Sequence, residues 1–266
     1  ATVAEQLGDG LQIRFMQVQV LSVAPTGNSN MKEFINYREQ DNSKFTGTDT
    51  EKLFRKNKKR QPEDWIYHNK EINYIYNEQG FREKPFKEID WKESVVIFGC
   101  SNVEGVGLAS EDTLARRLEK IIDRPVVNLG IEGAGVDLAC WNSTILHSYY
   151  PKPKAVIQIW SIFDRYIDKN QSHYQSYLPN YPGYQYKLNW EERSIRYVLT
   201  DREMWKNDTI YIENSFYGYT KNIKKSLKLE KSFQIIDFAR DLAHPGIKSN
   251  RLAAEELAKT LEAYKI

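Results

Sequence analysis

The sequence predicts an α/β fold, a three-layer α/β/α sandwich with a central parallel sheet. From residue 94 onward, strand-like runs at 94–99, 126–129 and 155–160 alternate with helical segments at 111–123 and 135–149. The strand-like runs are apolar on both faces, as in sheets that helices cover on two sides. Strands that alternate with helices form βαβ units, whose right-handed crossovers join parallel strands.

The helical segments carry apolar stripes that would pack on such a sheet. In the segment 111–123, leucine and isoleucine side chains fall on one face, Ser110 precedes the segment and Pro125 marks its exit. In the segment 250–264, leucines and alanines form one stripe, which predicts a helix that closes the domain.

The pattern divides the chain into an N-terminal extension, residues 1–90, and an α/β domain, residues 91–266. Residues 11–20 alternate apolar and polar side chains, which predicts a strand with one buried face. Residues 31–70 are charged and poor in aliphatic side chains, which favours a mobile or surface-wrapping arm. Residues 72–76 alternate again and predict an edge strand.

The composition describes a globular chain of balanced charge. The 266 residues are 41% hydrophobic, which supports a real core, and 38 lysines and arginines face 36 acidic residues, for a formal charge of +2. That balance argues against a general nucleic-acid or polyanion binder. The basic run at 56–60 fits a solvated face or loop more simply than a phosphate track.

Targeting signals are not indicated by the sequence. No stretch approaches the apolar length that crosses a bilayer, and no basic region followed by an apolar core stands at the N-terminus. Cys100 and Cys140 lie far apart and form no disulfide framework, so a reducing compartment is expected. We therefore expect a cytoplasmic protein with neither a membrane nor a nucleic-acid partner.

Ser101 stands where a buried-strand run breaks into a glycine-flanked turn. Such a run delivers the chain to the carboxyl edge of the sheet, where ligands bind in open α/β folds. Gly99 and Gly105 permit a tight turn that leaves the Ser101 hydroxyl exposed, so that it could attack a carbonyl. The alternative is an ordinary strand-to-helix turn in which Ser101 or Asn102 caps the helix. Cys100 is a weaker candidate for the nucleophile, because its side chain should point to the opposite side of the chain from that of Ser101.

A general base and its orienting carboxylate are supplied by Asp241 and His244. An aspartate three residues before a histidine can fold back so that its carboxylate meets Nδ1 of the ring, leaving Nε2 for the serine. The pair follows a strand-like run at 233–238 and precedes the C-terminal helix. The alternative is that Asp241 caps a helix and His244 is a surface residue.

These motifs resemble those of the SGNH or GDSL hydrolases over about the last two-thirds of the chain. The first block of that family matches Gly99, Ser101 and Gly105, with Cys100 in place of the usual aspartate. The resemblance therefore implies that Ser101 is the nucleophile. In the second block it implies that the N–H of Gly133 joins the oxyanion hole.

The last block, Asp-x-x-His, matches Asp241 and His244 as they stand, with a proline following. The family's fold is a three-layer α/β/α sandwich of the flavodoxin-like kind, which agrees with the predicted architecture. The third block departs from the pattern, because the position of the family's asparagine falls on Ile162 or Phe163, and neither can donate a hydrogen bond. Losing one oxyanion donor costs about 10²–10³ in rate.

Ser161 and Arg165 are the candidate substitutes for the missing oxyanion donor. Alternatively, Arg165 forms a surface ion pair with Asp164 or Asp168. Trp160, at the end of its strand, is a candidate substrate contact, with packing beneath a helix as the alternative.

A tyrosine-rich, polar stretch follows the third block, where substrate loops lie in the family. Tyr174 and Tyr177 within it, together with Asn102 and Trp160, are the residues predicted to contact substrate. Such stretches also arise as lids, interfaces or loop packing.

The sequence thus predicts a serine esterase or deacetylase that cleaves an O-acyl ester of a small molecule or carbohydrate. Neither a cofactor nor a metal is expected, since phosphate loops and metal-ligand spacings are absent from the sequence. Two alternatives remain open. The same triad could transfer the acyl group to another hydroxyl, or the altered third block could mark a catalytically silent binding or assembly module.

Overall fold

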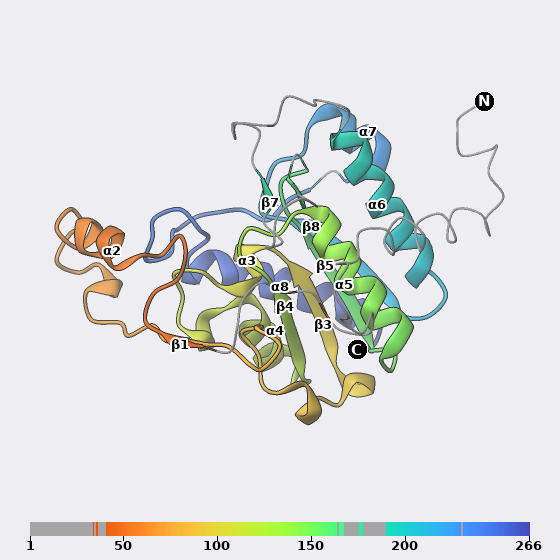
Figure 1. Ribbon diagram of the computed structural model, residues 1–266, viewed down its shortest axis with the longest axis horizontal. Coiled ribbons are helices and arrows are strands. Elements are labelled where there is room, and N and C mark those ends of the chain that lie inside the picture. The colour runs from red at the N-terminus through yellow and green to blue at the C-terminus, as the bar shows by residue number, and fades with distance from the viewer. Residues whose placement is uncertain are drawn as a thin grey trace, which may run out of the picture.

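A four-stranded parallel sheet forms the centre of the protein (Figure 1). The computed structural model describes residues 41–163, 165–167, 176–177, 190–229 and 231–266, together with Phe34 and Asn36. The sheet order is β4-β3-β5-β8, and all three neighbouring pairs are parallel. Its strands are β3 (Val95–Gly99), β4 (Val126–Gly130), β5 (Ala155–Trp160) and β8 (Ile210–Ser215).

The strands β3, β4 and β5 are each buried along their whole length because both faces of the sheet are covered. Successive side chains of β3 enter two separate apolar clusters: Val95 and Ile97 belong to one, and Val96 and Phe98 belong to the other. The predicted three-layer α/β/α fold is therefore confirmed.

Helices cover the sheet on both faces (Figure 1). The helices α4 (Leu114–Ile122) and α8 (Ile247–Ala263) pack together on one face, and α5 (Val136–Tyr149) and α6 (Trp190–Trp205) pack together on the other. Two shorter helices are α3 (Ser101–Glu104) and α7 (Lys221–Leu227). Helix α4 begins later than predicted, because residues 110–112 form a 3₁₀ turn and Thr113 caps the helix through the N–H of Arg116.

The prediction of a strand-like run at 233–238 is wrong. The N–H of Phe233 donates to the carbonyl of Ser215, at the end of β8 (2.8 Å), and the Ser249 hydroxyl of α8 accepts the N–H groups of Ile236 and Asp237. Only an isolated bridge joins Phe238 to Pro245. The fourth strand is β8, which sequence reasoning missed along with α6. In β8, Tyr211 and Glu213 interrupt the apolar pattern that marks a strand covered on both faces.

The described part of the N-terminal extension lies against the α/β domain. A two-residue strand, β1 (Asn42–Ser43), pairs antiparallel with β2 (Tyr74–Ile75), and α2 (Glu51–Lys58) lies between them in the chain. The strand predicted at 72–76 is therefore present, but in a separate small sheet. The strand predicted at 11–20 lies outside the described residues, and the division at residue 90 stays a prediction.

Two further strands, β6 (Tyr166–Ile167) and β7 (Ser176–Tyr177), pair antiparallel. Both cysteines have free thiols and are buried, as the sequence analysis expected of a chain without a disulfide framework. Within the described ranges, no helix is both long enough and apolar enough to cross a membrane.

Candidate active site

Ser101 is the first residue of α3 and follows β3 directly at the carboxyl edge of the sheet. Cys100 precedes it in an extended conformation, and the chain turns immediately into the helix. Gly105 ends α3 in the left-handed region at φ 84°, and a Cβ there would lie 2.3 Å from the side chain of Thr113. The turn therefore requires glycine at this position.

Asp241 and His244 lie in a tight loop that the bridge between Phe238 and Pro245 closes. Leu242 adopts a left-handed conformation at φ 59°. This lets one Asp241 oxygen, Oδ1, accept the backbone N–H groups of Ala243 (3.1 Å) and His244 (3.2 Å). The local fold thus fixes the carboxylate and leaves its second oxygen for the imidazole.

The structure brings the three side chains into one hydrogen-bonded line. His244 Nδ1 lies 2.5 Å from Asp241 Oδ2, and His244 Nε2 lies 2.8 Å from Ser101 Oγ. Asp241 is buried, and Ser101 is only 3% exposed, so the expectation of an exposed Ser101 hydroxyl is wrong. Burial alone would raise the pKa of Asp241, but the hydrogen bond and charge of His244, with two backbone N–H groups, hold that pKa below its ordinary value. Asp241 is therefore set to stay ionised beside the imidazole.

Gly133 lies in the loop after β4 and adopts a left-handed conformation at φ 80°. Three contacts fasten this loop to the Ser101 turn. Asn128 Nδ2 donates to the carbonyl of Val103 (2.9 Å), the N–H of Ile131 donates to the carbonyl of Gly99 (3.1 Å), and the N–H of Glu132 donates to the Glu104 carboxylate. The predicted oxyanion loop and the serine turn therefore form one hydrogen-bonded unit.

The loop after β5 holds the candidates for the missing oxyanion donor. Arg165 Nη1 lies 3.4 Å from Ser161 Oγ, so these two candidates contact each other. Trp160, by contrast, is 1% exposed and its Nε1 donates to Glu213 Oε1 at 3.0 Å. Its side chain packs in the core, which is the alternative that the sequence left open for it. The residues offered as ion-pair partners of Arg165 lie outside the described ranges.

Tyr217, which the sequence analysis did not single out, lies beside the serine turn. Burial and the neighbouring Cys100 raise the pKa of its hydroxyl, and Arg165 and Asn102 act in the opposite direction. Asn102 itself is 4% exposed. Of the predicted substrate contacts, Tyr174 lies outside the described residues, and only the backbone of Tyr177, in β7, is described.

Residues 44–49, which we call the bracing segment, contact both sides of the site. On the Gly133 side, the Glu132 carboxylate accepts hydrogen bonds from the Thr46 hydroxyl (2.9 Å), the Thr48 N–H (2.7 Å) and the Thr48 hydroxyl (2.5 Å). A Cβ on Gly47 would lie 3.1 Å from the same carboxylate, so Glu132 also packs closely against the segment.

On the histidine side, the bracing segment holds Arg240, the neighbour of Asp241. The Arg240 guanidinium forms a buried ion pair with Asp49 (2.7 Å) and donates to the carbonyl of Lys44 (2.6 Å). Asp49 also accepts from the Tyr74 hydroxyl (2.6 Å), which in turn accepts the N–H of Gly107 (2.7 Å). These contacts tie the histidine loop to the chain that follows α3.

Sequence reasoning missed Glu132, Arg240 and Asp49 because their partners lie far away in the chain. The signal that could have pointed to them is a pair of ionisable residues directly beside the predicted Gly133 and Asp241. Among the residues that the structure describes, no group of histidine, cysteine and acidic side chains has the arrangement of a metal site.

Among known proteins, the chain is similar to solved structures. No family model matches the chain, and no curated protein matches it. The matched structures include an acetyl xylan esterase from Butyrivibrio proteoclasticus, with 15% identity over 66% of this chain and 65% of that one, and a TM-score of 0.42.

Two further matches are of the same kind. A carbohydrate esterase shares 14% identity over 68% of each chain, with a TM-score of 0.47. A member of the lipolytic G-D-S-L family from Veillonella parvula shares 12% identity over 62% of this chain and 96% of that one, with a TM-score of 0.43. The structures that this chain resembles are thus those of GDSL and SGNH hydrolases and carbohydrate esterases, and the chain spans about two thirds of the length of the first.

Proposed function

We propose that the protein is a serine hydrolase that cleaves an O-acyl ester, with Ser101, His244 and Asp241 as its catalytic triad. The observation that carries the proposal is the pair of contacts made by His244, whose two ring nitrogens reach Ser101 Oγ at 2.8 Å and Asp241 Oδ2 at 2.5 Å. Each distance lies within the reach that proton transfer and ring orientation require.

In this mechanism, Ser101 Oγ attacks the ester carbonyl while its proton passes to His244 Nε2. The ionised Asp241 holds the ring and stabilises the imidazolium that forms. The imidazolium then gives its proton to the leaving alkoxide, and an acyl-enzyme remains. Water attacks the acyl-enzyme with His244 as the general base, which releases the carboxylic acid and restores Ser101.

The negative oxygen of the tetrahedral intermediate needs hydrogen-bond donors. We assign the N–H groups of Ser101 and Gly133, since the first amide groups of a helix have no intrahelical acceptor and the Gly133 loop is fastened to the serine turn. Ser161 and Arg165, which contact each other in the loop after β5, are the candidates for a third donor.

A carbohydrate or small-molecule acetyl ester is the substrate class that this proposal names. A silent binding module would have no need of an aspartate that is buried and ionised against a histidine, and the triad geometry therefore favours the enzyme.

Labelling with a fluorophosphonate tests the proposal, because such probes react with activated serines. We expect one adduct by intact mass in the wild type and in Ser110→Ala, an exposed serine that serves as the control, and none in Ser101→Ala or His244→Ala. A folded wild-type protein that takes up no probe, or that is labelled equally in Ser101→Ala, would contradict the proposed triad.

A further inference from the structure

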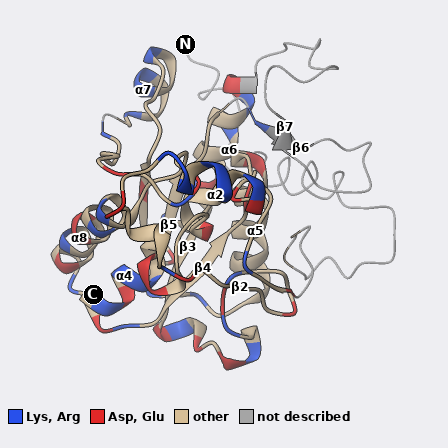
Figure 2. Cartoon of the chain, turned by 90° about the vertical axis from the view of Figure 1, so that its left-hand side faces the viewer, with Lys and Arg blue, Asp and Glu red and all other residues tan. Residues whose placement is uncertain are grey.

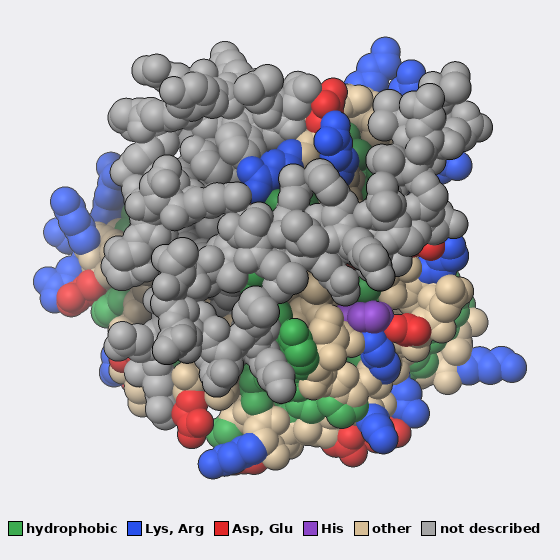
Figure 3. Space-filling model, turned by 45° about the vertical axis from the view of Figure 1, so that its right-hand side comes forward, with side chains coloured by type: hydrophobic (Ala, Val, Ile, Leu, Met, Phe, Trp, Pro, Cys, Tyr) green, Lys and Arg blue, Asp and Glu red, His purple; other side chains and the backbone are tan. Residues whose placement is uncertain are grey.

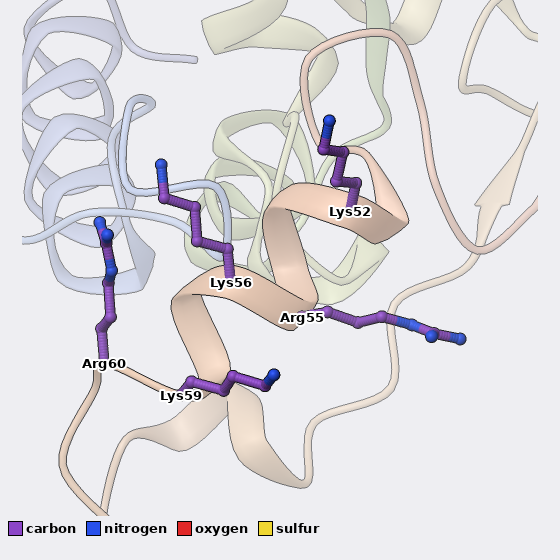
Figure 4. A pocket seen from close by; sticks show the side chains of 5 residues that line it. All are labelled: Lys52, Arg55, Lys56, Lys59 and Arg60. Atoms are coloured by element: carbon purple, nitrogen blue, oxygen red, sulfur yellow. The ribbon is translucent and has the colours of Figure 1, made fainter.

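Helix α2 and the turn after it carry a hollow of about 410 Å³ that is lined by five cations (Figure 4). The lining side chains are Lys52, Arg55, Lys56, Lys59 and Arg60. Only Arg55 has a carboxylate partner among the described residues: Glu51, at 2.6 Å. The other four cations form no ion pair with any residue that the structure describes.

The cations are arranged in a row. Lys52, Lys56 and Arg60 follow one another at intervals of four residues, and Figure 4 shows them pointing the same way. Lys52 and Lys56 are separated by about 6 Å of axial rise on α2, so their like charges repel each other, and Arg60 lies in the turn after the helix. The helix dipole favours cations in the last turn, but Lys52 lies in the first turn, where it opposes the dipole.

This charged helix is held firmly in place. Thr50 caps it by accepting the N–H of Leu53 (3.1 Å), and the Phe54 ring lies under the Arg240 guanidinium, 5.0 Å from its centre. Asn57 is 5% exposed, and its Nδ2 donates to the carbonyl of Arg240 at 3.1 Å. Since Arg240 precedes Asp241, the cationic row is anchored directly on the histidine loop.

Helix α7 also carries lysines, at Lys221, Lys224 and Lys225, but another described face of the protein is mixed in charge. In Figure 2, Lys and Arg line α2, whereas Figure 3 shows Lys and Arg interspersed with Asp and Glu over the described lower part of another face. The overall charge of +2 therefore conceals a local excess of positive charge. Such an excess raises the local concentration of anionic ligands.

We propose that this hollow binds an acidic polysaccharide and leads it to the triad, so that the ester substrate is an O-acylated anionic polymer. The proposal rests on the ester hydrolase proposed above. Charge favours this ligand, because a chain with repeated carboxylates complements these cations and can also carry the O-acyl ester that the triad would cleave, whereas nucleic acid carries no such ester. Among the described side chains that line the hollow, none is an aromatic ring on which a base could stack.

Binding to polygalacturonate tests the proposal on the Ser101→Ala protein, where turnover cannot interfere. We expect binding that weakens steeply with salt and is absent for neutral dextran. The triple variant Lys52→Glu/Lys56→Glu/Arg60→Glu should bind at least about tenfold more weakly. The matched control is Lys87→Glu/Lys120→Glu/Lys259→Glu, which makes the same change in net charge at exposed positions outside α2.

Several outcomes overturn the proposal. Equal binding by the two triple variants would show that net charge alone acts, and tighter binding to a DNA oligonucleotide or to phosphatidylserine vesicles than to polygalacturonate would assign the hollow to another partner. Because the readout is binding to a protein without its serine, failure here is distinct from failure of fluorophosphonate labelling, which concerns the triad alone.

Discussion

The parallel sheet and the bracing segment both hold the candidate active site, but by opposite means. The sheet positions the loops that carry Ser101 and Gly133 through strands that are buried on both faces and almost wholly apolar. The bracing segment has almost no regular structure and acts through buried polar contacts with Glu132 and Arg240. The sheet supplies the edge at which the proposed chemistry would occur, and the bracing segment joins the two loops that meet there.

The difference teaches where each kind of support is vulnerable. Apolar burial is non-directional and tolerates small changes of shape, whereas a buried ion pair depends on both partners. Variants at the sheet edge should therefore separate catalysis from stability. Variants in the bracing segment should affect both.

The largest expected effect is on the sheet side. Ser101→Ala should lower kcat for an acetyl ester by about 10⁴–10⁶, as removal of the nucleophile does where a triad acts as a unit, with little change in unfolding free energy. Steady-state kinetics with a chromogenic acetate and urea denaturation measure the two quantities. Cys100→Ala, at the adjacent buried position, is the control and should retain kcat within about threefold. Activity that survives in Ser101→Ala would place the nucleophile elsewhere.

The next effect is on the bracing segment. Arg240→Ala leaves the Asp49 carboxylate buried without its partner, and should lower the unfolding free energy by about 3–5 kcal/mol. The matched control is Arg55→Ala, which breaks the exposed pair with Glu51 and should cost less than about 1 kcal/mol. Urea denaturation compares the two variants.

A double variant separates the effect of losing the ion pair between Arg240 and Asp49 from the effect of losing side-chain volume. Asp49→Leu combined with Arg240→Met removes both charges, and should recover much of the stability that Arg240→Ala loses. If Arg240→Ala cost no more than Arg55→Ala, the buried pair would not support the histidine loop.

The sheet side also contains a buried polar group, Asp201, on α6 beneath β5 and β8. Gln158 Nε2 (2.8 Å) and the Tyr211 hydroxyl (2.7 Å) both donate to its Oδ2. Burial raises the pKa of Asp201 to about 7. In the unfolded chain this carboxyl ionises at about pH 4, so from about pH 4 to 7 the folded protein holds a proton that the unfolded chain has lost. Its contribution to stability is therefore complete below about pH 4 and declines as the pH rises through about 7.

Asp201→Asn should remove that decline. Between pH 5 and 8, the wild type should lose about 2 kcal/mol more unfolding free energy than the variant, as measured by urea denaturation at both pH values. Asp241 does not interfere, because its lowered pKa places its titration at more acidic pH. Equal pH dependence of the two proteins would show that Asp201 is ionised throughout.

The sequence predicts the parallel sheet well and the bracing segment poorly. The strands β3, β4 and β5 are predicted well because apolar runs of strand length, bounded by turn residues, are typical of strands covered on both faces, and the spacing of Asp241 and His244 predicts their contact. β8 is missed because its polar side chains Tyr211 and Glu213 interrupt the apolar run. These side chains take part in a buried polar network. Nothing local marks the bracing segment, since Asp49 and Arg240 are 191 positions apart and only the folded chain brings them together.

The smallest effect tests whether the bracing segment supports catalysis as well as stability. Glu132→Gln keeps the size of the side chain but replaces the carboxylate by an amide. The amide offers the Thr46 and Thr48 donors one acceptor oxygen in place of two. If Glu132 positions the neighbouring Gly133 N–H, kcat for an acetyl ester should fall by about tenfold while KM changes less, because a displaced oxyanion donor is felt mainly in the transition state.

Thr48→Ser should retain kcat, since it keeps the hydroxyl that donates to Glu132, whereas Thr48→Val should behave like Glu132→Gln. Thr260→Val is the control for loss of a threonine hydroxyl, because that hydroxyl bonds only within α8, to the carbonyl of Glu256. A purely structural role for Glu132 would lower the unfolding free energy of Glu132→Gln and leave kcat of the folded enzyme unchanged. A fall in kcat that follows the Thr48 series would place the bracing segment within the catalytic support, since it would connect Thr48, which is 84 positions away from Glu132 in the sequence, to the proposed oxyanion donor.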